Sequence, residues 1–206
     1  MIIAVEGADR TGKETLVKNL KDKFESQLYT VKTFEFPFND FFTYKIIYWM
    51  LAKKLAKRNP AIFQFIQFLN KFFVQCVILI YTLFFDVIIL DRWKASSVVY
   101  GTVGGCSDLY VNTLSSFLFD PTYTIIIGDK TYSREEEEDE LEKDNEFQKS
   151  VKKLYLQYYD TRHYLNTSEE DSSIIKYFDN SVSKEELTLQ VFSFIDGQKF
   201  TRRFEW

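Results

Sequence analysis

Near the start of the chain lies the segment Gly7-Ala8-Asp9-Arg10-Thr11-Gly12-Lys13-Glu14-Thr15, which contains glycines, charged residues and threonines. The apolar run before it, residues 2–5, is typical of a short buried strand, and the apolar spacing of residues 16–20 is helical. A glycine-bounded loop between a strand and a helix is the setting of a phosphate-binding loop, where backbone N–H groups and the helix N-terminus face one anion. We therefore expect this stretch to bind a nucleoside triphosphate, with Lys13 at its β- and γ-phosphates.

Glu14 departs from the usual form of such a loop. The position after the lysine ordinarily carries Ser or Thr, whose hydroxyl ligates Mg²⁺. A carboxylate also binds Mg²⁺, which prefers oxygen ligands, but it brings a negative charge close to the triphosphate. Two roles therefore stay open for Glu14: a direct metal ligand, which we favour, or a side chain that points away from the metal.

The composition indicates one globular domain over residues 1–206. With 46% hydrophobic and 27% charged residues, the chain is long enough to bury a substantial core. A net charge of −4 argues against a dedicated nucleic-acid-binding protein. Cys76 and Cys106 fall in unrelated segments and form no metal or disulfide framework, which fits a reducing, cytoplasmic setting. Because the first strand begins at residue 2, we expect no signal peptide.

Segments typical of strands and helices alternate along the chain. Beyond the first strand, four more are predicted over residues 28–36, 86–91, 123–128 and 173–178. Beyond the helix after the loop, six more are predicted over residues 40–57, 61–85, 93–103, 107–119, 145–164 and 183–195. This alternation predicts an α/β fold, a five-stranded parallel sheet with helices on both faces. Its triphosphate site should lie at the carboxyl ends of the strands.

The most apolar segment is residues 61–85. Its uncharged core, residues 72–85, is shorter than the ~20 residues needed to span a bilayer, so we expect a buried or partner-covered helix and no membrane. A line of polar side chains follows one face of this helix, with Phe68 beside it: Gln64, Gln67, Lys71 and Gln75. Two interpretations stay open, a narrow solvent-facing stripe or the lining of a nucleobase pocket with Phe68 as the stacking surface.

Asp91 and Arg92 close the third predicted strand. A carboxylate at the end of a buried strand suits the binding of Mg²⁺ through its waters beside a phosphate loop. Arg92 can reach a transferring phosphoryl group. A surface ion pair is the alternative, but the phosphate loop favours the functional interpretation.

With these motifs placed, nearly the whole chain resembles the thymidylate kinase family. The loop, with Asp followed by Arg inside it, resembles the family's eukaryotic-type version. Residues 91–101, Asp-Arg-Trp-Lys-Ala-Ser-Ser-Val-Val-Tyr-Gly, resemble the family's Asp-Arg-aromatic motif with its trailing Ser and Tyr, and residues 142–148 resemble the exit of its lid. The resemblance implies a P-loop kinase fold with a lid at about residues 131–145. It also implies a homodimer packed through long apolar helices, and phosphorylation of dTMP to dTDP by ATP with Mg²⁺, a step of dTTP synthesis.

The resemblance further implies roles on the donor side. Arg10 would clamp the γ-phosphate of ATP and Lys13 its β- and γ-phosphates, and Arg10 would replace the catalytic arginines that an acidic lid lacks. Asp91 would organise Mg²⁺ and its waters, with Glu14 as a further metal ligand.

On the acceptor side, the same resemblance implies that Asp9 binds the 3′-hydroxyl of dTMP and that Arg92 holds its phosphate. The remaining acceptor-binding residues would be Phe36, Pro37, Phe68, Lys71, Ser96, Tyr100 and Gln148.

The chain also departs from the family's acceptor pattern. Asn39 stands where the family usually has an arginine that grips the acceptor phosphate. Counting back from Asp91 without gaps, Lys71 takes the place of the base-reading arginine and Gln67 that of the stacking phenylalanine, so Phe68 supplies the stack only after a shift of one residue. Two alternatives therefore stay open: a kinase for another or modified deoxypyrimidine monophosphate or nucleoside, and a nucleotide-binding interaction module with impaired catalysis.

Overall fold

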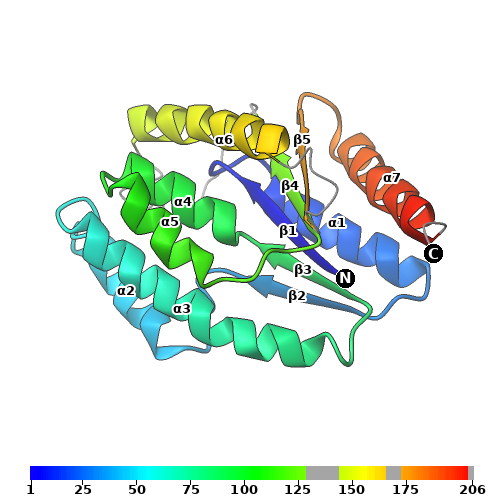
Figure 1. Ribbon diagram of the computed structural model, residues 1–206, viewed down its shortest axis with the longest axis horizontal. Coiled ribbons are helices and arrows are strands. Elements are labelled where there is room, and N and C mark those ends of the chain that lie inside the picture. Colours follow the sequence, from blue (N-terminus) through cyan, green and yellow to red (C-terminus); the bar gives the residue numbers. More distant parts are fainter. Residues whose placement is uncertain (129–143, 166–172, 204–206) are drawn as a thin grey trace.

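Five parallel strands form the centre of the structure, in the order β2-β3-β1-β4-β5 (Figure 1). The computed structural model describes residues 1–128, 144–165 and 173–203. The strands are β1 (Ile2–Gly7), β2 (Val31–Glu35), β3 (Val87–Asp91), β4 (Tyr123–Ile127) and β5 (Ile174–Phe178). The predicted parallel sheet is confirmed, with the strand that precedes the phosphate loop at its centre.

Seven helices lie within the described residues. They are α1 (Lys13–Ser26), α2 (Phe42–Ala52), α3 (Pro60–Tyr81), α4 (Lys94–Val103), α5 (Asp108–Ser116), α6 (Asn145–Leu165) and α7 (Lys184–Arg203). Every predicted helix is present. The second strand begins later than predicted, because residues 27–29 form the turn that ends α1, with Leu28 at a φ of 67° and the Tyr29 N–H bonded to the Phe24 carbonyl. The predicted lid at 131–145 lies outside the described residues except for residues 144 and 145.

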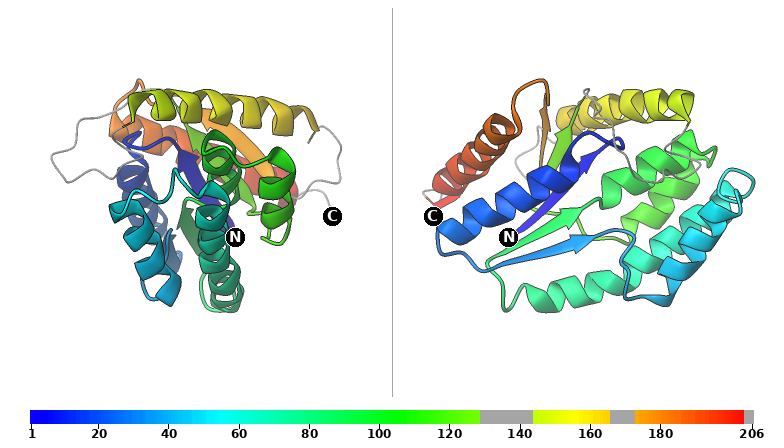
Figure 2. Two further views of the ribbon diagram at one scale, coloured as in Figure 1. Left: turned by 90° about the vertical axis from the view of Figure 1, so that its left-hand side faces the viewer. Right: turned by 180° about the vertical axis from the view of Figure 1, so that it is seen from behind.

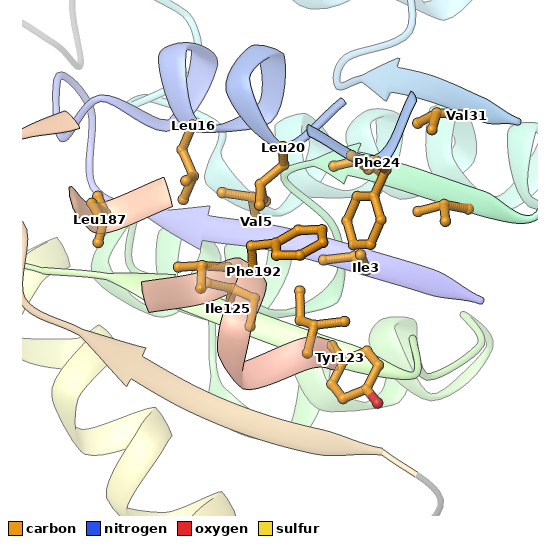
Figure 3. Close-up of a cluster of buried hydrophobic side chains, with 14 of the residues drawn as sticks. Ile3, Val5, Leu16, Leu20, Phe24, Val31, Tyr123, Ile125, Leu187 and Phe192 are labelled. Carbon is orange, nitrogen blue, oxygen red and sulfur yellow. The ribbon is translucent and has the colours of Figure 1, made fainter. Parts of the chain in front are cut away.

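Two helical layers cover the sheet (Figure 2). On one face, α1 and α7 pack over β1, β3 and β4 through side chains that include Leu20, Phe24 and Phe192 (Figure 3). On the other face, α3 covers β1, β2 and β3, while α4 and α6 cover β4 and β5. The helix α2 packs on α3 through a separate small cluster around Ile47 and Phe63. The three central strands, β1, β3 and β4, are buried on both faces, as their continuous apolar runs predict, whereas the edge strands β2 and β5 are only partly buried.

Helix α3 is long and apolar enough to cross a membrane by length and composition alone, and one third of its most apolar 18-residue window is buried against the rest of the chain. Its inward side chains, among them Phe68, Val74 and Ile78, pack on the sheet. That packing is expected of a core helix in a globular protein.

The topology brings three loops to one edge of the sheet. Because β2, β3 and β1 are neighbours and parallel, the segments that follow them leave the sheet side by side. The Arg92 N–H bonds the Val5 carbonyl at 2.9 Å, and the Phe36 N–H bonds the Asp91 carbonyl at 3.1 Å. The phosphate loop, the Asp91-Arg92 pair and the cis Phe36–Pro37 peptide therefore meet at the carboxyl ends of the strands.

Candidate active site

The phosphate loop depends on glycine at both ends. Gly7 has a φ of 147°, and a Cβ atom there would lie 2.6 Å from the backbone oxygen of Ile127. Gly12 has a φ of 89°, in the left-handed region, at the point where α1 begins. No other residue type fits both requirements without strain. The two glycines thus let the chain leave the central strand and turn the first N–H groups of α1 toward the cavity.

Lys13 lies folded over this loop. Its buried ammonium donates a hydrogen bond to the Ala8 carbonyl, which also accepts from the Thr11 hydroxyl at 3.0 Å. The Asn180 amide, from beyond β5, donates to the Thr11 carbonyl at 3.0 Å and fixes the loop from behind. Burial lowers the pKa of Lys13 to about 8, as does the nearby Arg92. An anionic ligand would therefore be attracted to a cation that is poorly solvated in this structure.

Asp9 and Arg92 join the phosphate loop to the end of β3. The Arg92 guanidinium donates to both the Asp9 carboxylate and the Gly7 carbonyl, and the latter bond is 3.3 Å long. The Tyr100 hydroxyl and the Gln148 amide each donate to the second Asp9 oxygen at 2.8 Å. Burial alone would raise the pKa of Asp9, but Arg92 and Lys13 outweigh it and lower the pKa. Asp9 is thus held as an anion by groups from the loop after β3, from α4 and from α6.

Asp91 is the candidate metal-binding carboxylate. Its Oδ1 atom is buried and has no hydrogen-bond partner among the described residues. Burial raises the pKa of Asp91, and the negative charges of Glu14 and Asp9 raise it further, against the opposing effect of Lys13 and Arg92. An orphaned buried oxygen beside a second carboxylate is a setting that a bound cation would stabilise. These residues therefore fit Mg²⁺.

A single cavity of about 890 Å³ extends along the carboxyl edge of the sheet. Its donor end is lined by Asp9, Arg10, Gly12, Lys13, Glu14, Thr15 and Lys184. The residues around Asp91 and Arg92 form its middle. Its acceptor end is lined by side chains that include Phe36, Pro37, Asn39, Tyr44, Tyr48, Gln67, Asn70, Lys71, Ser96 and Tyr100. The structure therefore brings both groups of predicted site residues into one space, and Gln148 joins them through Asp9.

The polar line on α3 is not a solvent-facing stripe. Gln64 and Lys71 are 5% and 3% exposed, so that interpretation is wrong. Gln67 and Lys71 line the cavity, as the pocket interpretation predicts, but Phe68 packs in the aromatic core against Phe72 and does not line the cavity. The stacking role predicted for Phe68 therefore does not fit its position, since its ring points into the core.

Lys71 has protein partners inside the site. Its ammonium donates to the Trp93 carbonyl at 2.6 Å and to the Ser97 hydroxyl at 2.7 Å, and it lies 6.0 Å from the centre of the Phe36 ring. Burial lowers the pKa of Lys71 to about 8, with a smaller lowering by Arg92 and an opposing effect of Glu6. Two of the three N–H donors of Lys71 are thus used within the protein.

Glu6 is a residue that the sequence interpretation missed. It lies on β1 immediately before the phosphate loop and is fully buried. Its carboxylate accepts the Trp93 N–H at 2.8 Å, the Ser96 hydroxyl, and the Tyr155 hydroxyl at 3.4 Å. The signal was present, because a charged residue inside a buried strand needs a partner. Which partner it finds depends on the tertiary structure.

The comparisons with known proteins agree on one family. The sequence model of the family described as thymidylate kinase matches residues 5–176. A curated thymidylate kinase of African swine fever virus (isolate Tick/South Africa/Pretoriuskop Pr4/1996) is 26% identical over 131 residues, which cover 63% of this chain and 52% of that protein. The match thus spans about half the length of this relative. The solved thymidylate kinase of Candida albicans matches with a TM-score of 0.70 and 20% identity, over 96% of this chain and 92% of that one.

Proposed function

The chain belongs to the thymidylate kinase family, and from this premise we propose that it transfers the γ-phosphoryl group of ATP to dTMP and releases dTDP. One observation carries the proposal: the phosphate loop and Arg92 line a single cavity and are joined directly through Asp9. A donor triphosphate on the loop and an acceptor phosphate at Arg92 would then face each other in that cavity. This is the arrangement that phosphoryl transfer requires, because its catalysis consists mainly of positioning and charge stabilisation.

The donor site is proposed at the loop. Backbone N–H groups at the start of α1 would bind the phosphates, and Lys13 would exchange its bond with the Ala8 carbonyl for bonds with the β- and γ-phosphates. Arg10 lines the same end of the cavity and would clamp the γ-phosphate. Both cations would offset the charge that spreads over the phosphoryl oxygens in the transition state.

The acceptor site is proposed between Arg92 and α3. The planar guanidinium of Arg92 would bind the phosphate of dTMP, which it can contact through more than one N–H group. Asp9 holds three donors, yet a carboxylate can accept about four hydrogen bonds, so one position would remain for the 3′-hydroxyl. Gln67 and Lys71 would face the base, and Tyr100 and Ser96 would close the sugar side.

Mg²⁺ is proposed to bind between Asp91 and Glu14. Among the described residues, no group of three or more His, Cys, Asp or Glu side chains is arranged to hold a metal ion, so phosphate oxygens and waters would complete its coordination. The bound ion would offset the charge of the β- and γ-phosphates. Asp91 and Glu14 would orient it from the sheet edge and from the first turn of α1.

A homodimer through α3 is part of the proposal. Away from the sheet, α3 and the turn after it present large apolar side chains, among them Ile80, Leu83 and Phe84, which are 58%, 79% and 70% exposed. A second copy would cover this surface, since monomeric proteins rarely expose large contiguous apolar patches. Sedimentation velocity should show a dimer of the wild type, and Ile80→Glu should release the monomer. A monomeric wild type at micromolar concentration would contradict this assembly.

The activity is tested by a coupled assay with an acceptor panel of dTMP, dUMP, 5-substituted dUMP analogues and thymidine. ATP with Mg²⁺ should support turnover of dTMP and none of thymidine, because Arg92 needs an acceptor phosphate. The Lys13→Ala protein serves as the control for contaminating kinases. Turnover of thymidine would indicate a nucleoside kinase, and ATP binding without turnover of any monophosphate would indicate an interaction module.

A further inference from the structure

We propose that Glu6 and Lys71 are positioning residues that hold the backbone of Trp93 from its two sides and thereby fix the direction of the Arg92 side chain. The inference rests on the proposed function, in which Arg92 binds the acceptor phosphate. It adds a device that neither the phosphate loop nor the Asp91-Arg92 pair contains. Neither Glu6 nor the backbone contact of Lys71 belongs to the roles assigned above.

The backbone after β3 adopts an unusual course. Arg92 has a φ of 68°, in the left-handed region, and Trp93 follows with φ −149° and ψ −124°. A non-glycine residue reaches such conformations only where its surroundings enforce them. The Arg92 side chain leaves the chain at this point, so its direction depends on how firmly the next peptide groups are held.

Glu6 holds the first side of this segment. Its Oε1 atom accepts the Trp93 N–H at 2.8 Å, while its Oε2 atom accepts the hydroxyl of Ser96 in the first turn of α4. Both bonds are buried, and a hydrogen bond is electrostatically stronger in such surroundings than in water. The carboxylate thus ties the end of β1 to the start of α4, across the residue that follows Arg92.

Lys71 holds the second side. From α3, its ammonium donates to the Trp93 carbonyl at 2.6 Å and to the Ser97 hydroxyl at 2.7 Å. The donor and the acceptor of the Trp93 main chain are therefore both bonded to buried, oppositely charged side chains from different elements. Hydrogen bonds to charged groups are stronger than those between neutral groups, which suits a segment held in a strained conformation.

The Trp93 ring completes the anchor. It is fully buried, stacks on Phe119 with ring centres 4.7 Å apart, and donates its indole N–H to the Phe119 carbonyl at 2.9 Å. With its ring and both main-chain groups fixed, Trp93 leaves little freedom for the peptide that carries Arg92. The guanidinium is thereby aimed at Asp9 and the middle of the cavity.

Two variants of Glu6 separate the effect of its side-chain length from the effect of its charge. Glu6→Gln keeps the length of the side chain and one oxygen that can accept the Trp93 N–H. Its NH₂ group can donate to the Ser96 oxygen, and the Ser96 hydroxyl can then donate to Tyr155. Glu6→Asp keeps the charge but draws the carboxylate back by about 1.5 Å, the length of one carbon–carbon bond. Ile3→Ala, on the opposite face of the same strand, is the control for a general loss of stability.

Amide hydrogen exchange at Trp93 and steady-state kinetics are measured on all proteins. Glu6→Asp should speed exchange of the Trp93 N–H by about tenfold or more, because an opened bond exposes that group. It should also lower kcat by about 10²-fold and weaken dTMP binding, since misplaced reacting groups lose their alignment. Glu6→Gln should stay within about tenfold of wild type in kcat, and Ile3→Ala should leave Trp93 exchange unchanged.

Two results would overturn the inference. One is a Glu6→Asp protein with wild-type Trp93 exchange and wild-type kcat. The other is a Glu6→Gln protein that is as impaired as Glu6→Asp.

Lys71→Met tests the second side and replaces Glu6→Asp should that protein not fold. A clamp predicts faster Trp93 exchange in Lys71→Met together with a lower kcat, whereas a residue that only contacts the base would raise the KM for dTMP and leave exchange unchanged. Exchange at Trp93 and calorimetric binding of dTMP need no turnover. A wild-type protein that binds but does not phosphorylate dTMP would thus defeat the proposed function, while the exchange data would still decide the clamp.

Discussion

The donor end of the cavity is formed mainly by one continuous stretch, residues 7–15, to which α7 adds Lys184. The acceptor end is instead assembled from side chains on β2, α2, α3 and α4 and the loops that follow β2 and β3. The donor end relies on backbone N–H groups and two glycines, so its chemistry is fixed by local conformation. The acceptor end relies on where helices pack, because Gln67 and Lys71 reach the cavity only through the position of α3 on the sheet.

The two ends of the cavity are therefore sensitive to different kinds of substitution. A donor site made of backbone is insensitive to most substitutions, except at the few positions where a charge or a positive φ is required. An acceptor site made of side chains from several elements changes specificity through small shifts of those elements. Substitutions at the two ends should therefore differ in kind: loss of rate at one, and altered acceptor binding at the other.

The largest effect is expected at the donor end, from Lys13→Ala. The substitution removes the ammonium that is proposed to leave the Ala8 carbonyl and bind the β- and γ-phosphates, so kcat should fall by about 10³-fold, which corresponds to about 4 kcal/mol. Circular dichroism should show an intact fold, because the hydrogen bond of the ammonium goes to the Ala8 carbonyl in the loop. Activity within a few-fold of wild type would remove the loop from the active site.

Next in size is Phe68→Ala, in the core beneath the acceptor end. Because Phe68 is a core residue at 9% exposure, the substitution should lower the free energy of unfolding by about 3 kcal/mol, measured by urea titration. The KM values of the folded fraction should not change. Its matched control is Gln67→Ala, one residue earlier and facing the cavity, which should raise the KM for dTMP by about tenfold with little loss of stability. A raised KM for dTMP in Phe68→Ala, with an unchanged KM in Gln67→Ala, would indicate that Phe68 is the stacking surface after all.

Arg92→Lys tests the junction of the two ends. Lysine keeps the charge but cannot bond Asp9 and the Gly7 carbonyl together through a planar fork, so kcat/KM for dTMP should fall by about 50-fold. The KM for ATP should change much less, because the donor end keeps Lys13 and Arg10. Equal losses for both substrates would place Arg92 at the donor phosphates.

The pH dependence of the free energy of unfolding tests whether Lys71, at the acceptor end, is a desolvated cation. The pKa of Lys71 is lowered to about 8 in the folded chain, so the unfolded chain binds more protons above that pH and stability rises as pH increases toward the ordinary value of a lysine. Glu6 opposes this lowering and Arg92 adds to it. The free energy of unfolding of the wild type should gain on the order of 2 kcal/mol over Lys71→Met between about pH 7.5 and pH 9.5. A difference that stays constant across this range would mean that Lys71 is not a desolvated cation.

Glu14→Ser has the smallest expected effect. If Glu14 ligates Mg²⁺, the serine protein should need about fivefold more Mg²⁺ for half-maximal rate at fixed ATP, which corresponds to about 1 kcal/mol. A titration of both proteins with Mg²⁺ measures this. A serine protein that needs less Mg²⁺ and gains rate would show that Glu14 points away from the metal.

The sequence was informative where structure is local. Strand, loop and first helix were predicted together because glycine spacing and apolar periodicity act over a few residues, and the alternation of segments predicted the parallel sheet. The same argument left two interpretations open for the polar line on α3, because helical spacing shows which residues share a face but not what covers that face. Gln64 and Lys71 are buried by α4 and by the segment around Trp93, which lie far along the chain.

Glu6 illustrates the limit most clearly. Its partners Trp93, Ser96 and Tyr155 come from three later segments, and only the pairing of β1 with β3 brings the first two within reach. The sequence could indicate that a buried acid needs partners, but it could not name them. Site residues that act through other residues depend on such long-range contacts, and they are the ones that sequence analysis misses.

The proposed function requires that the two ends of the cavity bind their nucleotides at the same time, with the phosphates facing each other. A bisubstrate compound, adenosine and thymidine joined through their 5′ positions by a polyphosphate chain, tests it directly by calorimetry. Because linked ligands gain from a high effective concentration, it should bind one molecule per chain at least ~10²-fold more tightly than ATP or dTMP alone, and Lys13→Ala and Arg92→Lys should each weaken it. Binding no tighter than that of ATP, or insensitive to Arg92→Lys, would contradict a shared cavity for donor and acceptor.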